Sequence, residues 1–337
     1  MTFMQRHFHR HFTTAGTILA LSLISIPTAQ ACAACGGTLS KNWEAQGIAS
    51  APGWSVQLAY DTLNQNKQRY GSGKAQAARL RAFTTAGGEV EDYTITQTVT
   101  TRLRYSAGTW GVSVAIPYLN RTHATYGNGW PGHSQYLHSS QRGVGDLRVL
   151  ARYSGFSPTG GSGVIVGIKL PTGSNTGHFS DGSALDSGLQ IGTGSTDTIL
   201  GAFTSGAIAG FGWFMQGSWQ HVVATKLALG GLSYRPGDVY ALNVGVRHAN
   251  FGAKFVPMLQ VNVIKRNIDT GTSVPLDPIT GVSISGGTLI YLAPGASYRV
   301  GNGVSFYGFV QLPVYQKVNS LQLTPSYILS LGARYSF

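Results

Sequence analysis

Apolar and polar residues alternate at every second position along most of this 337-residue chain. In the final segment, 325–337, tyrosine, leucine, alanine and phenylalanine share one face, and serine, glycine and arginine share the other, with Ile328 as the exception. A period of two places successive side chains on opposite faces of a β-strand. The same pattern recurs at 94–105, 146–153 and 239–248. The chain therefore predicts many strands, each with one apolar and one polar face.

About twelve such strands are expected, and bacterial outer-membrane barrels prefer an even number. The joins after the second, fourth, sixth, eighth and tenth strands are short, whereas the others are long, such as 64–92 and 119–144. Short periplasmic turns and long extracellular loops are typical of a transmembrane barrel. We therefore expect an all-β fold, a single antiparallel up-and-down β-barrel. The expected strands are 53–63, 93–106, 110–118, 145–156, 162–171, 196–206, 211–220, 238–249, 252–266, 286–300, 303–315 and 325–337.

The overall composition agrees with membrane insertion through strands. Charged residues make up only 11% of the chain, glycine is abundant at 46 residues, and the mean hydropathy is +0.02. After residue 31, no apolar run approaches the roughly 18 residues that a membrane helix needs. Any segment that crosses a bilayer must therefore be a strand.

The N-terminus has the features of a secretory signal peptide. Arg6 and Arg10 lie in a basic start, 15–26 is an apolar stretch too short to span a bilayer, and AQA at 29–31 offers a cleavage site. The expected location is thus the outer membrane of a Gram-negative bacterium. The expected organisation is a signal peptide at 1–31, a periplasmic segment at 32–52 and a porin-like barrel at 53–337.

Cys32 and Cys35 form a C-x-x-C pair at the expected mature start. In an oxidising compartment they can close a small local disulfide. Lipidation of Cys32 is a second interpretation, although Ala29 occupies the place where a lipobox usually has leucine. Two soft thiolates also suit copper(I) or zinc, which makes the pair a candidate metal site. Haem attachment is excluded because Gly36, not histidine, follows the pair.

Charged residues on the polar strand faces should point into the barrel, because charge that faces lipid is costly. All of the candidate arginines except Arg148 lie late in even-numbered strands, so they should gather near the periplasmic end, and the aspartates should lie near the outer mouth. A ring of guanidinium groups favours anions. The alternative is a structural role in which the arginines pair with carboxylates or lipid phosphates. The candidate lumen and selectivity residues are Arg102, Arg104, Arg148, Arg152, Arg247, Arg299, Arg334, Asp146, Asp197 and Asp238.

Aromatic residues accompany the short turns on the apolar face. Tyr105, Tyr153, Tyr298 and Tyr335 are expected to form a girdle at the membrane interface. The last residue, Phe337, resembles the C-terminal aromatic by which the outer-membrane assembly machinery recognises barrels. That machinery, outer-membrane lipids and a small solute are the expected partners. The net charge of +12 does not indicate nucleic acid, because no basic run is interleaved with aromatics.

Four short motifs occur in order along the middle of the chain: GVGDLR at 143–148, LPTG at 170–173, GTGSTD at 192–197 and RPGD at 235–238. Together they resemble a family of outer-membrane barrels assigned to the meta-cleavage pathway of phenol degradation, a broad group of transporter-like proteins. The resemblance implies a barrel that admits small aromatic or other organic solutes. It does not name a substrate.

Other chemistry has weaker support in the sequence. His123, His133 and His138 share one long join, but their spacing matches no metal motif, so a solvated loop is the competing interpretation. No G-x-S-x-G elbow occurs, and GTGSTD lacks the lysine of a phosphate loop. We therefore predict neither an enzyme nor a cofactor. The leading hypothesis is passive, channel-like movement of a small anionic or aromatic solute. Metal binding through Cys32 and Cys35 and a plugged structural barrel are the alternatives.

Overall fold

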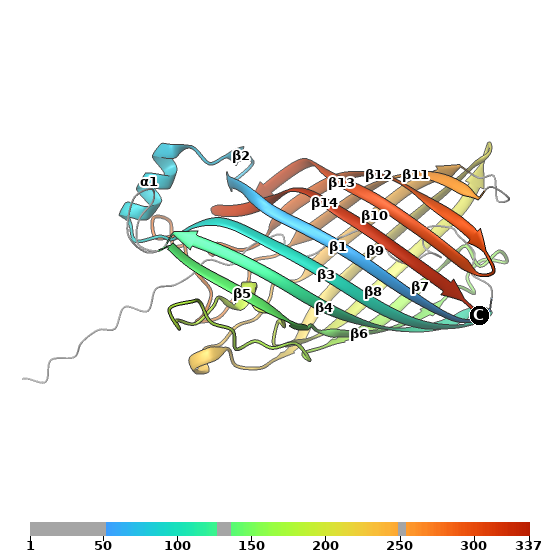
Figure 1. The fold of residues 1–337 in the computed structure, drawn as a ribbon, viewed down its shortest axis with the longest axis horizontal. Coiled ribbons are helices and arrows are strands. Elements are labelled where there is room, and N and C mark those ends of the chain that lie inside the picture. The colour runs from blue at the N-terminus through green and yellow to red at the C-terminus, as the bar shows by residue number, and fades with distance from the viewer. Residues whose placement is uncertain (1–51, 127–135, 249–253) are drawn as a thin grey trace, which may run out of the picture.

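The computed structural model describes residues 52–126, 136–248 and 254–337. Within these ranges twelve antiparallel strands form a closed barrel, as the sequence predicts (Figure 1). The barrel closes where the first strand pairs with the last, Ser55 lying opposite Ser336. The barrel strands are β1 (Gly53–Tyr70), β3 (Val90–Ala107), β4 (Trp110–Tyr126), β6 (Leu147–Tyr153), β7 (Ser162–Leu170), β8 (Ser195–Ile208), β9 (Phe211–Thr225), β10 (Val239–His248), β11 (Phe255–Arg266), β12 (Gly287–Gly301), β13 (Val304–Val318) and β14 (Leu321–Ser336).

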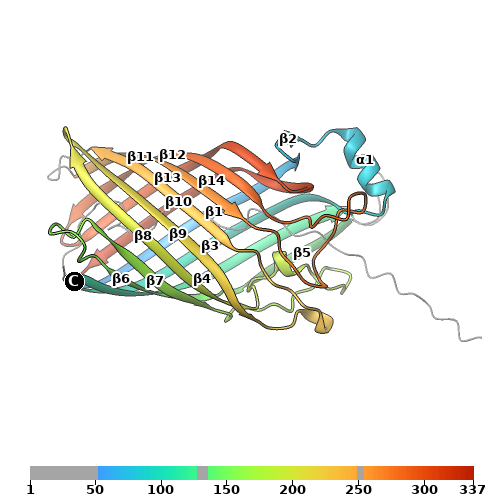
Figure 2. The ribbon, with the colours of Figure 1, turned by 180° about the vertical axis from the view of Figure 1, so that it is seen from behind.

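The two ends of the barrel differ. The C-terminus and the short turns lie at one end, which we call the turn end, and the smaller elements lie toward the opposite loop end (Figure 2). There β2 pairs with the end of β1, and β5 pairs with the end of β4. The smaller elements are β2 (Gly73–Lys74), α1 (Ala77–Thr85), β5 (Tyr136–Val144) and the 3-10 turns η1 (Ser187–Leu189) and η2 (Leu229–Gly231).

Side-chain exposure in β14 follows the alternation of the sequence. Leu331 and Tyr335 are 46% and 49% exposed on the outer face, whereas Ser330 and Arg334 are 1% and 8% exposed on the inner face. Ile328, the one apolar residue at an inward position, is fully buried inside. The barrel is therefore apolar outside and largely polar inside, the arrangement of a barrel solvated by lipid.

An aromatic girdle surrounds the turn end on the outer face, as predicted. Trp54 lies opposite Tyr105 with ring centroids 5.0 Å apart, and Trp110 lies opposite Tyr153 at 4.6 Å. Tyr153 is half-buried, whereas the other three are exposed. Amphipathic rings in a band are typical of a membrane–water interface. The girdle continues with the exposed residues Phe211, Phe255, Tyr298, Phe306, Tyr335 and Phe337.

Strands β1, β3 and β4 extend further toward the loop end than the sequence predicts. Their outer face is apolar up to a row of register partners formed by Tyr60, Val99 and Tyr118. In the next row Gln97 donates to the Tyr60 hydroxyl at 3.0 Å and accepts from Asn120 at 3.1 Å. The wall therefore continues past the apolar band as a sheet with polar side chains on its outer face.

The expected long joins need correction for the same reason. The join 64–92 contains the end of β1, β2 and α1, and the join 119–144 contains the end of β4 and β5. The join after β13, also expected to be long, is a two-residue turn of Asn319 and Ser320, with Ser320 at φ 54°. Beyond the bilayer both strand faces can meet water, so period-two alternation no longer marks the strands.

Helix α1 covers part of the loop end. Leu80 and Phe83 are buried and pack with Val90, Ile284 and Leu321, which come from β3, the β11–β12 connection and β14. Among the described residues no helix has the length and hydropathy needed to cross a bilayer. The helix therefore serves as a cap that ties three separate segments together.

Apolar side chains fill one side of the barrel interior. Tyr307 of β13 reaches across β14 and accepts a hydrogen bond from Gln57 Nε2 at 2.8 Å. Gly332 makes this approach possible, because a Cβ there would lie 2.2 Å from the Tyr307 ring. Because this side is packed, open space remains against the opposite wall. The packed cluster consists of Ala59, Val256, Met258, Ala293, Tyr307 and Phe309.

Candidate functional site

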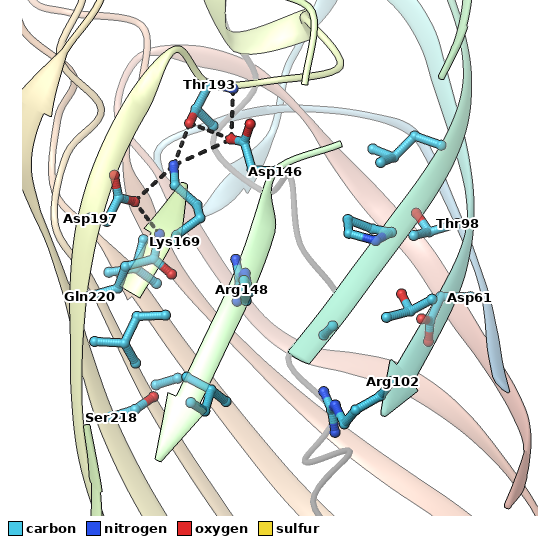
Figure 3. Close-up of a pocket in the computed structure, with 18 of the residues that line it drawn as sticks. Asp61, Thr98, Arg102, Asp146, Arg148, Lys169, Thr193, Asp197, Ser218 and Gln220 are labelled. Carbon is cyan, nitrogen blue, oxygen red and sulfur yellow. Dashed lines mark hydrogen bonds and ion pairs between the residues drawn. The ribbon is translucent and has the colours of Figure 1, made fainter. Parts of the chain in front are cut away.

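A cavity of about 480 Å³ runs inside the barrel. It extends from Arg104 and Arg334 near the turn end to Ser187 and Gln190 near the loop end. Its middle is lined by hydroxyl and amide groups, among them Thr98, Ser218 and Gln220, and by arginines that point into it (Figure 3). Small-molecule sites in proteins are commonly about 300 to 1,000 Å³. The cavity is therefore large enough for a small organic solute.

Half of the basic side chains of the cavity come from one register row of the sheet. Residues directly opposite each other on neighbouring strands point to the same face, which here is the lumen. Because barrel strands tilt against the barrel axis, such a row climbs from the turn end at Arg334 toward the loop end at Asp197. We call this the basic row, and its members from β14 to β8 are Arg334, Gln57, Arg102, Ala115, Arg148, Lys169 and Asp197.

Seven of the ten predicted lumen residues line the cavity, and three do not. Arg247 is buried near the turn end, where the space above Gly212 accommodates its guanidinium. Arg299 is exposed at the same end, next to the β12–β13 turn. The seven lining residues are Arg102, Arg104, Arg148, Arg152, Arg334, Asp146 and Asp197.

Asp238 departs from the expectation that it faces the lumen. Its carboxylate accepts a hydrogen bond from Trp219 Nε1 at 3.1 Å and lies 2.8 Å from His221 Nδ1. Both partners sit at outward positions of β9, where the neighbouring Met215 and Val223 are exposed. Asp238 precedes the first residue of β10, so strand parity does not fix the direction of its side chain. It belongs to the outer surface of the loop end.

Lys169 is the centre of a buried polar cluster at the loop end of the cavity (Figure 3). Its Nζ lies 2.9 Å from Asp197 Oδ2 and 3.5 Å from Asp146 Oδ2. It also donates to Ser195 Oγ at 2.8 Å and to Thr193 Oγ1. Its side chain is only 3% exposed. The cluster thus holds the Lys169 ammonium between two carboxylates. Because these carboxylates neutralise its charge, Lys169 adds no positive potential to the cavity.

Residues 171–194, which we call the inner loop, narrow the loop end of the cavity. Arg121 Nη1 donates to the backbone oxygens of Leu189 and Gln190, both at 2.9 Å. Asp146 fastens the two ends of the inner loop, because it accepts from Gly173 N at 3.1 Å and Thr193 N at 2.9 Å. The inner loop is therefore fixed to the barrel wall by charge-assisted hydrogen bonds, which are among the stronger kind.

Three of the four sequence motifs meet where the inner loop leaves the wall. Gly145 of GVGDLR, Gly173 of LPTG and Gly192 of GTGSTD pack directly against one another. A Cβ on Gly173 would lie 2.6 Å from Gly192 Cα, closer than Cβ atoms come to other atoms in proteins, and 3.1 Å from Gly145 Cα. The glycines are needed because the two ends of the inner loop approach each other and the wall at backbone distance.

The cavity carries a clear excess of positive charge. Eight basic and three acidic side chains line it. Arg121 is bonded to neutral carbonyls, and Arg152 lies over the Phe203 ring at 3.7 Å, so neither contact neutralises its charge. Charge of one sign in a narrow, low-dielectric channel concentrates ions of the opposite sign. The basic residues are Arg102, Arg104, Arg121, Arg148, Arg152, Lys169, Arg266 and Arg334, and the acidic residues are Asp61, Asp146 and Asp197.

The predicted metal residues are not assembled within the described ranges. Cys32, Cys35 and His133 lie outside them. His123 is buried in β4, where its Nδ1 is 2.8 Å from Thr94 Oγ1, and His138 lies on β5 opposite Ala124. Among the described residues, no three or more histidine, cysteine, aspartate or glutamate side chains gather as a metal site.

Sequence reasoning missed several residues of the site. Lys169 and Arg121 lie at inward positions of β7 and β4, and Lys169 is the residue directly before the LPTG motif. That position beside a recognised motif was a usable signal. Gln57, which separates two arginines of the basic row, carries no such signal because its role depends on strand register.

The barrel resembles solved outer-membrane proteins. An outer-membrane channel from Pseudomonas putida F1 is similar with a TM-score of 0.59 and 12% sequence identity, over 86% of this chain and 97% of that one. The monoaromatic hydrocarbon channel CymD has a TM-score of 0.46 at 9% identity, over 89% and 94%. The toluene transporter TodX of Pseudomonas putida has a TM-score of 0.42 at 9% identity, over 92% and 96%.

Sequence comparison adds no closer relationship: no known family model and no curated protein matches the chain. At 12% identity, the likeness to the first channel shows the fold. That fold is the twelve-stranded β-barrel of bacterial outer-membrane proteins.

Proposed function

We propose that this protein is a channel of the bacterial outer membrane, through which small organic anions move passively. The observation that carries the proposal is the basic row, because it brings arginines from three separate strands to one wall of a single cavity. Passive movement requires attraction strong enough for entry and weak enough for exit. Fixed cations spread along the path satisfy both conditions better than one deep site would.

The lining also suits an organic solute. Leu63, Ile264 and Ile328 form an aliphatic patch in the cavity and belong to a buried cluster with Leu289, Tyr291 and Leu323. An apolar body on that patch would leave its charged group free to meet Arg102 or Arg148. The motif resemblance to barrels of phenol degradation supports an aromatic body for the solute, but it does not identify one. Nothing in the proposal requires catalysis.

Flux of two solutes that differ in charge but hardly in size tests this function. Liposomes that contain the protein should swell faster in isosmotic glucuronate than in glucose, because the cavity has an excess of cations. Liposomes without protein provide the baseline. Arg81→Gln removes one positive charge at an exposed position on α1, outside the cavity, so its rates should equal those of the wild type. Equal rates for the two solutes would reject anion preference, and no rate above the baseline would reject the channel.

A plugged structural barrel remains the competing function. The specific observation in its favour is the inner loop, which Arg121 and Asp146 fasten inside the loop end. In that case the liposomes would show no flux while the barrel remains folded. The swelling experiment therefore decides between the two functions.

A further inference from the structure

A hollow of about 640 Å³ lies on the outer face of the wall, where β8, β9 and β10 run side by side (Figure 2). Its floor is the register pair Ala202 of β8 and Gly217 of β9. A Cβ added to Gly217 would meet no neighbouring atom within 4 Å, so the space above it is open. Leu200, Met215 and Leu242 stand around this floor and are 44%, 43% and 39% exposed. The wall therefore has an apolar depression bounded by side chains that project outward.

A row of register partners borders the hollow on the side of the loop end. It begins at Trp219 of β9, which also lines the hollow, and continues through Tyr240 of β10 and Lys265 of β11 to Thr288 and Lys317. Residues opposite each other on neighbouring strands share one face. Here it is the outer face, because Tyr240 and both lysines are exposed. We call these five residues the outer row.

The outer row lies at the level where the apolar band of the barrel ends. Phe255 of the girdle and Lys265 are ten positions apart on β11, and the outward residues between them include the exposed Leu259 and Val261. Ten residues at about 3.4 Å each, on a strand tilted by about 40°, rise about 26 Å along the barrel axis. The apolar band of a transmembrane barrel is about 25 Å tall. Lys265 therefore reaches the headgroup level, and the hollow lies below it, among the acyl chains of the same leaflet.

The lysines of the outer row are not neutralised by the protein. Within the described ranges, none of the ion pairs involves Lys265 or Lys317. Asp238, which precedes β10, already accepts from Trp219 Nε1 and lies 2.8 Å from His221 Nδ1. Neighbouring strands are about 4.8 Å apart, so the backbones of the two lysines, with β12 between them, are about 10 Å apart. Two positive charges at headgroup level are complementary to the phosphates of a lipid.

We propose that the hollow and the outer row together bind one phosphate-bearing glycolipid of the outer leaflet. An acyl chain lies over Gly217, and the phosphates of the headgroup meet Lys265 and Lys317. Trp219 and Tyr240 suit the boundary between chain and headgroup, because amphipathic rings favour the membrane interface. Two lysines match a headgroup with two phosphates, as in lipid A, better than a phospholipid with one. The inference rests on the outer-membrane location in the proposed function, with the loop end outward, but not on transport.

Native mass spectrometry of the whole chain in detergent tests the site, with lipid A and monophosphoryl lipid A as the probes. The double variant Lys265→Gln/Lys317→Gln removes both cations, and it should fold because both side chains are exposed. Lys254→Gln/Arg81→Gln is the matched control, because it removes two exposed charges away from the outer row. Each basic residue beside an anionic lipid strengthens binding about fivefold. We therefore expect lipid A to bind about 30-fold more weakly to the lysine variant and unchanged to the control.

A second variant tests the hollow itself. Gly217→Leu fills it and should weaken binding about tenfold, equivalent to the loss of about two buried methylene groups. Val246→Leu, at an exposed position of the same face outside the hollow, is its control and should bind as the wild type does.

Three results would overturn the proposal. They are equal affinity of the wild type for lipid A and its monophosphoryl form, unchanged affinity in the lysine variant, and unchanged affinity in Gly217→Leu. The test is independent of the proposed transport. A barrel that binds lipid A but gives no flux in liposomes would refute the channel alone, and flux without lipid binding would refute the lipid site alone.

Discussion

Replacement of Lys169 by methionine tests whether the polar cluster holds the loop end of the barrel together. The change keeps the length of the side chain and removes its charge, so Asp146 and Asp197 lose the cation that lies 3.5 and 2.9 Å away. Breaking a buried pair by removing one partner costs about 3 to 5 kcal/mol. Asp146 keeps its bonds from Gly173 and Thr193, so we expect the lower end, about 3 kcal/mol of unfolding free energy.

The assay is equilibrium unfolding by urea in detergent or lipid vesicles. Lys265→Met is the control, because Lys265 is exposed on the outer face near the end of β11. Asp197→Asn alone and combined with Lys169→Met completes a double-mutant cycle, in which a coupling of about 1 to 2 kcal/mol is expected for groups in direct contact. A loss below about 0.5 kcal/mol for Lys169→Met, or strictly additive effects, would refute the reasoning.

Two further predictions concern the loop end. Gly173→Ala should displace the inner loop, because its Cβ would lie 2.6 Å from Gly192 Cα. Single-channel conductance should therefore rise in this variant. Gly143→Ala is the control, because a Cβ there has open space, and it should leave the conductance unchanged. Equal conductance in both variants would contradict a narrowing role for the inner loop. The unfolding free energy should rise as pH falls from 7 toward 5, because burial raises the pKa of Glu89 to about 7 in the folded state, against 4.5 in the unfolded chain. The rise is at most about 3 kcal/mol, and it should be smaller in Glu89→Gln; an equal rise would assign it to other groups.

The barrel itself was predictable because lipid imposes a simple rule on every strand that crosses it. Leu331 and Tyr335 face outward and Arg334 faces inward, as alternation requires. Where that rule ends, the sequence loses its signal: the end of β4 from Asn120 onward and the tight turn at Ser320 were both expected to belong to long joins.

The candidate site was only partly predictable. The alternation of side chains along each strand identified inward arginines such as Arg102 and Arg148. Their alignment in one row depends on strand register, which the sequence of a chain with several similar strands does not specify by itself. The outward position of Asp238 was not predicted, because the alternation of side chains does not extend to the residue before a strand.

Charge selectivity is the most direct test of the basic row as the functional element. In a planar bilayer with a gradient of potassium chloride, the reversal potential of the wild type should indicate preference for chloride, because cations exceed acids along the cavity. The double change Arg102→Gln/Arg148→Gln should shift it toward potassium, and Arg81→Gln on the exposed face of α1 should not. A wild-type channel that prefers potassium, or a double variant with an unchanged reversal potential, would contradict the account.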